Sequence, residues 1–140
     1  MRRLTDLQER AELADLAALY AVIVDARDFA RFDEVFTADA LLDTGRGRRS
    51  GLLEITEAMA GLLRYEATSH VLGQQLLSVT DDGGIEGVTY CEAHHLRVVG
   101  DERIDQVMHI QYHDRFVQTP DGWRIVYRRL EVPWTADQPV

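Results

Sequence analysis

Apolar residues in the first third of the chain recur at helical spacing. They lie three or four positions apart, at Leu13, Leu16, Ala17, Tyr20 and Val24. Thr5 or Asp6 can cap this helix, because a side-chain oxygen there accepts from a free backbone N–H. We expect the helix to run to about Val24. Two shorter helices are expected after it, one capped by Asp28 and one capped by Ser50.

The second half of the chain changes period. It predicts four long strands at residues 69–79, 85–99, 103–117 and 123–132, in addition to a short strand at residues 40–42 in the first part of the chain. The connectors between the long strands are short and rich in Gly, Asp and Pro, which favours antiparallel hairpins. Helices first and a meander afterwards predict an α+β fold, with three N-terminal helices on one face of a curved antiparallel sheet. Such a curved, capped sheet encloses a pocket.

Composition narrows the possible partners. The 140 residues include 24 acidic and 15 basic side chains, for a net charge of −9, which argues against binding nucleic acid or an anionic membrane. The single cysteine, Cys91, can form neither a disulfide framework nor a zinc cluster. The longest apolar run, residues 16–24, is far shorter than the ~20 residues that span a bilayer. With no signal peptide and no linker, we expect one cytoplasmic domain over residues 1–140.

Asp25 is the first candidate for chemistry. Helical spacing places it on a face with Ala18, Ala21 and Val22, so its carboxylate is expected to extend over an apolar surface. Burial of an unpaired carboxylate is costly, and a partner is therefore expected. The alternative is that Asp25 only caps the turn that follows the helix.

Histidines supply the second set of candidates. His70 opens the first long strand, where an imidazole facing a pocket can exchange protons near neutral pH. The alternative is a histidine at the sheet rim, bonded to a carbonyl. His94 and His95 are adjacent in one strand and must point to opposite faces, so only one of them can enter the pocket.

Three aromatic or apolar residues, Tyr20, Met108 and Tyr112, are candidate pocket walls, although core packing is the simpler interpretation of each. Arg128 and Arg129 point to opposite faces of the last strand, and a buried arginine requires a carboxylate or an anionic ligand. No phosphate-binding loop, nucleophile elbow or cysteine pair is present, and no spacing favours a metal site. We therefore expect neither a metal nor a cofactor.

Several motifs together resemble the SnoaL-like proteins of the nuclear-transport-factor-two-like superfamily. They are Tyr20-x4-Asp25-x-Arg27-Asp28, Phe36-Thr37-x-Asp39-Ala40, a helix over residues 51–63, Ser69-His70 and Asp121-Gly122-Trp123-Arg124-Ile125. The resemblance extends over nearly the whole chain and implies a cone-shaped fold. It is specific for the fold and much less specific for the reaction.

The catalytic members that the chain resembles most are scytalone dehydratases and hexachlorocyclohexane dehydrochlorinases. In those families an Asp–His dyad occupies the positions of Asp25 and His70. The resemblance further implies a second pocket histidine at His95 and a pocket arginine at Arg128. The dehydratases' pair of substrate-orienting tyrosines is replaced by Val24 and Thr44, which argues against scytalone itself as the substrate.

Taken together, the resemblance and the residues predict a cofactor-independent lyase or isomerase of the dehydratase or polyketide-cyclase kind. A His–Asp dyad would act on a small, mainly apolar molecule that carries a carbonyl or hydroxyl group. The alternative is a non-catalytic ligand-binding protein, or an accessory subunit of a ring-hydroxylating oxygenase with the same fold. Strands rich in Val, Ile and Tyr further predict a homo-oligomer, either a dimer or a trimer.

Overall fold

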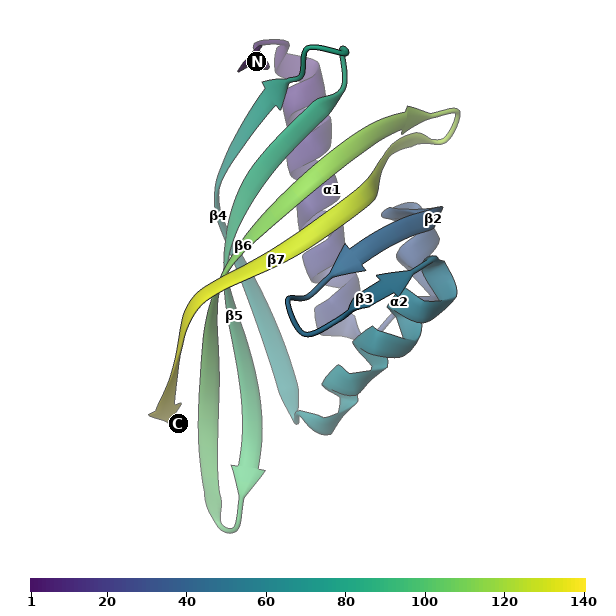
Figure 1. The fold of residues 1–140 in the computed structure, drawn as a ribbon. Coiled ribbons are helices and arrows are strands. Elements are labelled where there is room, and N and C mark those ends of the chain that lie inside the picture. Colours follow the sequence, from purple (N-terminus) through teal and green to yellow (C-terminus); the bar gives the residue numbers. More distant parts are fainter.

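The structure is a computed structural model that describes residues 1–140 (Figure 1). In chain order its elements are β1 (Arg2–Arg3), α1 (Leu7–Ala26), the 3₁₀ helix η1 (Phe29–Glu34), β2 (Phe36–Asp43), β3 (Arg48–Ser50), α2 (Leu52–Met59), the 3₁₀ helix η2 (Ala60–Arg64), β4 (Ala67–Val79), β5 (Ile85–Val99), β6 (Glu102–Thr119) and β7 (Gly122–Pro139). The predicted α+β class is confirmed. All helical segments precede the four long strands.

One curved, unclosed sheet contains all seven strands, in the order β1-β4-β5-β6-β7-β2-β3. The four long strands form the predicted antiparallel meander, and β5 coincides with the predicted residues 85–99. One pairing departs from the predicted antiparallel arrangement, because β2 runs parallel to β7. This pairing joins segments far apart in the chain, so no local turn signal could reveal it.

The helix ends follow the expected chemistry only in part. Asp6 caps α1 by accepting a hydrogen bond from the Glu9 backbone N–H at 2.8 Å. Asp28 makes no side-chain cap on η1, and Gly51 rather than Ser50 precedes α2. At that second helix the Glu54 carboxylate accepts from the Ser50 backbone N–H instead, at 2.6 Å, which satisfies a donor at the helix start.

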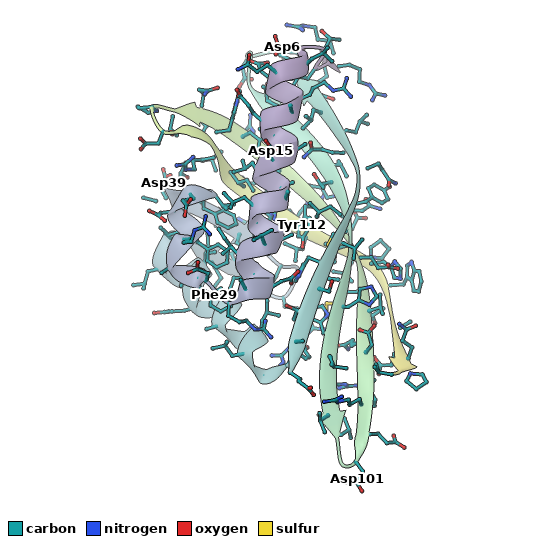
Figure 2. All side chains as sticks on the ribbon, turned by 180° about the vertical axis from the view of Figure 1, so that it is seen from behind. Asp6, Asp15, Phe29, Asp39, Asp101 and Tyr112 are labelled. Atoms are coloured by element: carbon teal, nitrogen blue, oxygen red, sulfur yellow. The ribbon has the colours of Figure 1, made fainter.

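Helix α1 crosses one face of the sheet, and α2 lies against β2 and β3 at one edge of the sheet (Figure 1). The core fills the layer between α1 and the sheet. Tyr112 of β6 lies beside the lower half of α1 in Figure 2 and is 1% exposed. The largest buried apolar side chains around it are Leu13, Ile23, Phe32, Phe36, Ile55 and Ile125. The hairpin of β5 and β6 extends beyond the helices, with Asp101 at its tip (Figure 2). No helix is long and apolar enough to cross a membrane.

Candidate functional site

Asp25 and His70 meet where the end of α1 approaches the start of β4. His70 Nδ1 lies 2.7 Å from Asp25 Oδ1, and the His70 backbone N–H donates to Asp25 Oδ2 at 2.8 Å. The His70 side chain is 4% exposed and that of Asp25 is 28% exposed. The two residues therefore form a hydrogen-bonded pair at the margin of the core.

This pairing fixes which ring nitrogen of neutral His70 carries the proton. An ionised carboxylate only accepts hydrogen bonds, so Nδ1 donates and Nε2 keeps its lone pair. Nε2 makes no hydrogen bond with the protein. Burial is the main influence on the pKa of His70 and lowers it, although the hydrogen bond and charge of Asp25 act in the opposite direction. At neutral pH, Nε2 is thus available to accept a proton.

The surroundings of Asp25 differ from the apolar face expected from sequence. Ala18 and Val22 are exposed, and only Ala21 of that set is buried. The carboxylate is instead held by polar groups, because Thr68 Oγ1 donates to Oδ1 at 2.9 Å in addition to the two His70 donors. Thr68 and His70 are two positions apart in β4, so both side chains point to the same face of the sheet.

Arg27, directly after α1, has an unusual backbone. Its φ of 61° and ψ of 27° are left-handed, and it is the only residue other than glycine with positive φ. The Asp28 N–H donates to the Ile23 carbonyl across it, in the arrangement that commonly places glycine at this position. A side chain here costs about 1 kcal/mol or more. The guanidinium donates to Thr68 Oγ1 at 3.2 Å and to the Tyr65 carbonyl at 3.3 Å.

His95, not His94, faces the dyad. His95 is 3% exposed, and its ring centroid lies 6.0 Å from that of His70. Its Nδ1 lies 3.0 Å from the Gln106 carbonyl oxygen, which can only accept, so Nε2 is again the free nitrogen. Burial is the largest influence on the pKa of His95 and lowers it. His94 points to the opposite face and pairs there with Asp105, at 2.6 Å.

Arg128 turns into the core, and Arg129 lies on the outer face. Arg128 Nε and Nη2 donate to the two Asp114 carboxylate oxygens at 2.7 and 2.8 Å, and the side chains of Arg128 and Asp114 are each 1% exposed. The guanidinium carbon lies 4.4 Å from the Tyr20 ring centroid and 4.0 Å from that of Tyr112. The third nitrogen, Nη1, is buried without a hydrogen-bond partner. Such a donor is costly unless a ligand satisfies it.

The remaining predicted residues surround this group. Tyr20 packs edge-on against His70, with ring centroids 6.3 Å apart. Burial raises the pKa values of Tyr20 and Tyr112, so both phenols are neutral. Met108 is half-buried and shares a cross-strand row with Ala93 and His70. Burial also raises the pKa of Cys91 to about 11, which keeps that thiol protonated.

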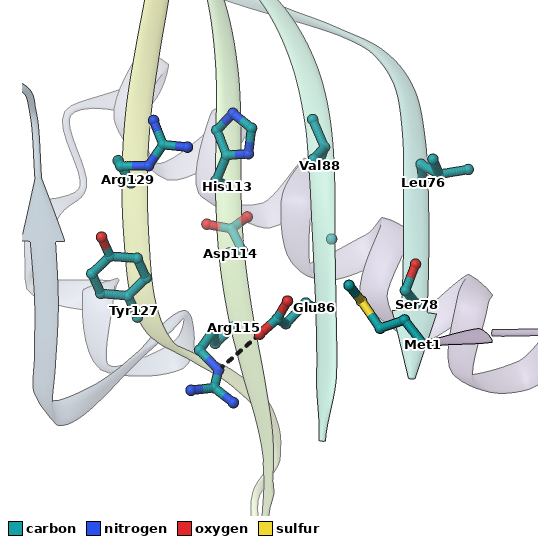
Figure 3. A pocket seen from close by; sticks show the side chains of 11 residues that line it. Met1, Leu76, Ser78, Glu86, Val88, His113, Asp114, Arg115, Tyr127 and Arg129 are labelled. Atoms are coloured by element: carbon teal, nitrogen blue, oxygen red, sulfur yellow. Dashed lines mark ion pairs between the residues drawn. The ribbon is translucent and has the colours of Figure 1, made fainter. Parts of the chain in front are cut away.

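The clearest hollows of the molecule lie elsewhere, and neither Asp25 nor His70 lines them. Figure 3 shows one on the face of the sheet that α1 does not cover, with Arg129, His113, Val88 and Leu76 in a row across four strands. No group of three or more His, Cys, Asp or Glu side chains is arranged to hold a metal ion.

Sequence reasoning did not select three residues that the structure adds to the site. Arg27 was noted only as part of a motif, while Thr68 and Asp114 were not singled out. Asp114 could have been sought, because a buried Arg128 implies a carboxylate, but the strand register that pairs the two residues was unknown. Thr68 is joined to Asp25 only by the packing of α1 on β4.

Comparisons with known proteins agree with this architecture. An uncharacterized protein of Mycobacterium tuberculosis is 30% identical over 136 residues, which cover 94% of this chain and 89% of the relative. A proposed scytalone dehydratase from Novosphingobium aromaticivorans has a similar crystal structure, with a TM-score of 0.83, 20% identity, and coverage of 96% of this chain and 91% of that one.

A hexachlorocyclohexane dehydrochlorinase from Novosphingobium barchaimii is also similar in structure. Its TM-score is 0.81 at 17% identity, with 94% of this chain and 91% of that chain covered. At such identities these two structures establish a shared fold and nothing further. Residues 5–129 match the SnoaL-like domain, and with this match over most of its length the chain belongs to the SnoaL-like family.

Proposed function

We propose that the protein is a cofactor-independent acid–base enzyme, a dehydratase, isomerase or cyclase acting on a small, mainly apolar substrate with a carbonyl or hydroxyl group. The observation that carries the proposal is the hydrogen bond between Asp25 and His70, which leaves a neutral His70 with a free Nε2. A positioned base of this kind accelerates proton transfer by roughly 10²–10⁴-fold. Two proteins with the same fold are named as a dehydratase and a dehydrochlorinase, and both names denote elimination reactions of this type, which supports the proposal.

In the dehydration form of the reaction, His70 Nε2 removes a proton from the carbon next to a carbonyl. The electron pair of that C–H bond forms a new C=C bond, and the C–O bond at the next carbon breaks. The departing hydroxide takes the proton back from the His70 imidazolium and leaves as water. Asp25 holds the ring and stabilises the imidazolium.

Three further groups support this assignment of roles. Arg128 Nη1 has no protein partner and would donate to the carbonyl oxygen, where negative charge develops. His95 Nε2 would accept a hydrogen bond from a substrate hydroxyl. Tyr20, Met108 and Tyr112 would form the apolar walls, and exclusion of water by these walls would strengthen the charge interactions.

The proposal can be tested with small β-hydroxy ketones, beginning with 3-hydroxy-1-tetralone, whose loss of water gives fluorescent 1-naphthol. We expect His70→Ala and Asp25→Asn to lower kcat by roughly 10²-fold or more, with the far-ultraviolet circular dichroism spectrum unchanged. His94→Ala is the matched control, since His94 lies on the opposite face of the sheet, and it should keep the wild-type rate.

Unchanged rates in both dyad variants would refute the catalytic assignment. The alternative is a ligand-binding protein without catalysis. It would bind these ketones in calorimetry but neither convert them nor exchange their α-protons for deuterium in D₂O. Exchange without loss of water would show that the protein removes the α-proton but does not dehydrate these ketones.

A further inference from the structure

The Asp25 carboxylate has a third support that lies outside the dyad. Thr68 Oγ1 donates to Asp25 Oδ1, and Arg27 Nη1 in turn donates to Thr68 Oγ1. A hydroxyl has one proton, and the carboxylate and the guanidinium leave only one direction open for it. The chain of hydrogen bonds therefore runs from Arg27 through Thr68 to Asp25.

We propose that Arg27 and Thr68 are positioning residues, which fix the rotation of the Asp25 carboxylate and thereby the orientation of the His70 ring. The inference rests on the proposed function of the Asp25–His70 pair and extends it to two residues that do not touch the substrate.

The backbone at Arg27 supports a specific use of its side chain. Glycine is the usual residue at this left-handed position after a helix, and it would adopt the conformation without strain. Strain that persists in a structure points to a role for the residue that bears it. The guanidinium reaches both Thr68 Oγ1 and the Tyr65 carbonyl, so the strained residue joins α1 to β4 and to the end of η2.

The geometry at the carboxylate shows what this support does. Oδ1 accepts from both Thr68 Oγ1 and His70 Nδ1, whereas Oδ2 accepts from the His70 backbone N–H. Without Thr68, the carboxylate keeps only donors from His70 itself, and it can rotate together with the ring that it should hold. Consecutive hydrogen bonds also polarise one another, so the charge of Arg27 strengthens the bond from Thr68.

Arg27 also contributes a positive charge near His70. The titratable and charged groups that face His70 from the surrounding elements are Asp25, Tyr20, Arg27, His95 and Arg128. Among these, Asp25 favours the imidazolium, whereas the two arginines disfavour it. Removing Arg27 is therefore expected to raise the pKa of His70.

The test uses the full-length protein and a readout that needs no substrate. In proton NMR, the His70 Hδ1 signal should be sharp and slow to exchange in the wild type. In Thr68→Val, which keeps the shape but loses the hydroxyl, we expect this signal to broaden and exchange faster, while Thr68→Ser should restore it. Thr119→Val is the control, because that hydroxyl bonds only within the β6–β7 turn.

Turnover of 3-hydroxy-1-tetralone gives the second readout. Thr68→Val and Arg27→Gly should lower kcat by roughly 10- to 100-fold with KM little changed, since misplacing a catalytic group affects the transition state most. Arg27→Gly should unfold close to the wild-type temperature, because relief of the backbone strain offsets the loss of two hydrogen bonds, and it should move the His70 titration to higher pH.

An unchanged Hδ1 signal in Thr68→Val, or an unchanged kcat in Arg27→Gly, would overturn the inference. So would a loss of kcat that Thr68→Ser fails to rescue. Failure of the proposed function looks different. In that case the NMR changes occur as expected, while the wild-type protein converts no ketone.

Discussion

The pair of Arg128 and Asp114 places two opposite charges in the interior. Each side chain is 1% exposed, and two parallel hydrogen bonds join them. Transfer of two charges from water into a core is costly, and their attraction offsets that cost only when the geometry is good. The two tyrosine faces that enclose the guanidinium add cation–π attraction.

Removal of one partner should therefore be far more harmful than removal of both. We expect Asp114→Leu to lower the free energy of unfolding by about 3–5 kcal/mol, because it leaves an unpaired buried charge. The double variant Asp114→Leu/Arg128→Met should recover most of this loss. Urea denaturation measures both, and Glu34→Gln, in an exposed pair with Arg31, is a control that should change stability by less than about 1 kcal/mol. A double variant as unstable as Asp114→Leu alone would contradict this account.

The buried histidines give stability a pH dependence whose sign can be stated. The pKa values of His70 and His95 are both lowered, first of all by burial. As pH falls through the usual histidine range near 6.5, the unfolded chain takes up protons at these two rings and the folded chain does not. Stability contributed by these rings is thus complete above that range and decreases below it. The pKa of His94 is raised by its hydrogen bond to Asp105, so this ring acts in the opposite direction.

We expect urea denaturation to show a smaller free energy of unfolding at pH 5 than at pH 7. The double variant His70→Gln/His95→Gln should show a weaker decrease over the same interval. A wild-type protein with equal stability at both pH values would show that these rings are not kept neutral by burial.

At the scale of elements, the sequence predicted those helices and strands whose formation depends on residues close together in the chain. The long strands were recognised because period-two alternation and turn residues are properties of short segments. Helix α1 was recognised because its apolar face and its Asp6 cap are also local features of the sequence. The strands β1 and β3, with two and three residues, are too short to show a period. The parallel pairing of β2 with β7 depends on packing across the whole sheet.

The site divides in the same way. Asp25 and His70 became candidates through their positions on a helix and a strand, and their match to two positions of a family pattern favoured a catalytic role. His95 was preferred to His94 by the same resemblance. Thr68 lies near in sequence to a selected residue, but its role depends on how α1 packs against β4. Side-chain contacts of this kind have no periodic signal in the sequence.

The cap of α1 provides a test at this scale. We expect Asp6→Ala to lower the free energy of unfolding by about 1 kcal/mol, because the Glu9 N–H then loses its acceptor. Asp6→Asn keeps an acceptor oxygen and should remain close to the wild type. Thermal or urea denaturation distinguishes the two variants, and equal losses in both would show that charge rather than the hydrogen bond matters.

At the scale of the molecule, one face of the sheet remains uncovered. It carries exposed apolar side chains at Val71, Leu76, Tyr90 and Trp134, the last stacked on His109. The hollow of Figure 3 continues this face, with Arg129 and the ion pair of Arg115 and Glu86 along its border. Contiguous exposed apolar surface with a charged border favours contact with another protein surface.

We therefore expect this face to join copies of the chain into a dimer or trimer. Sedimentation velocity should show a wild-type particle two or three times the 15.9 kDa chain mass. Leu76→Glu should shift it toward the monomer, and Leu53→Glu, at an exposed residue of α2, should leave it unchanged. A wild-type monomer at high micromolar concentration would contradict the expectation.

The pairing of β2 with β7 has a consequence for the order of events during synthesis. The Val35 carbonyl accepts from the Ile125 N–H at 2.7 Å, and residues 41–43 of β2 pair with residues 127–129 of β7. β3 follows β2 directly and can pair with it early, but a ribosome must deliver nearly the whole chain before β2 acquires its second neighbour, β7. Until then Phe32 and Phe36, both buried in the finished fold, lack part of their cover. We therefore expect the nascent chain to be most prone to aggregate just before its last strand emerges, and a chaperone that binds exposed apolar residues would act chiefly at that stage.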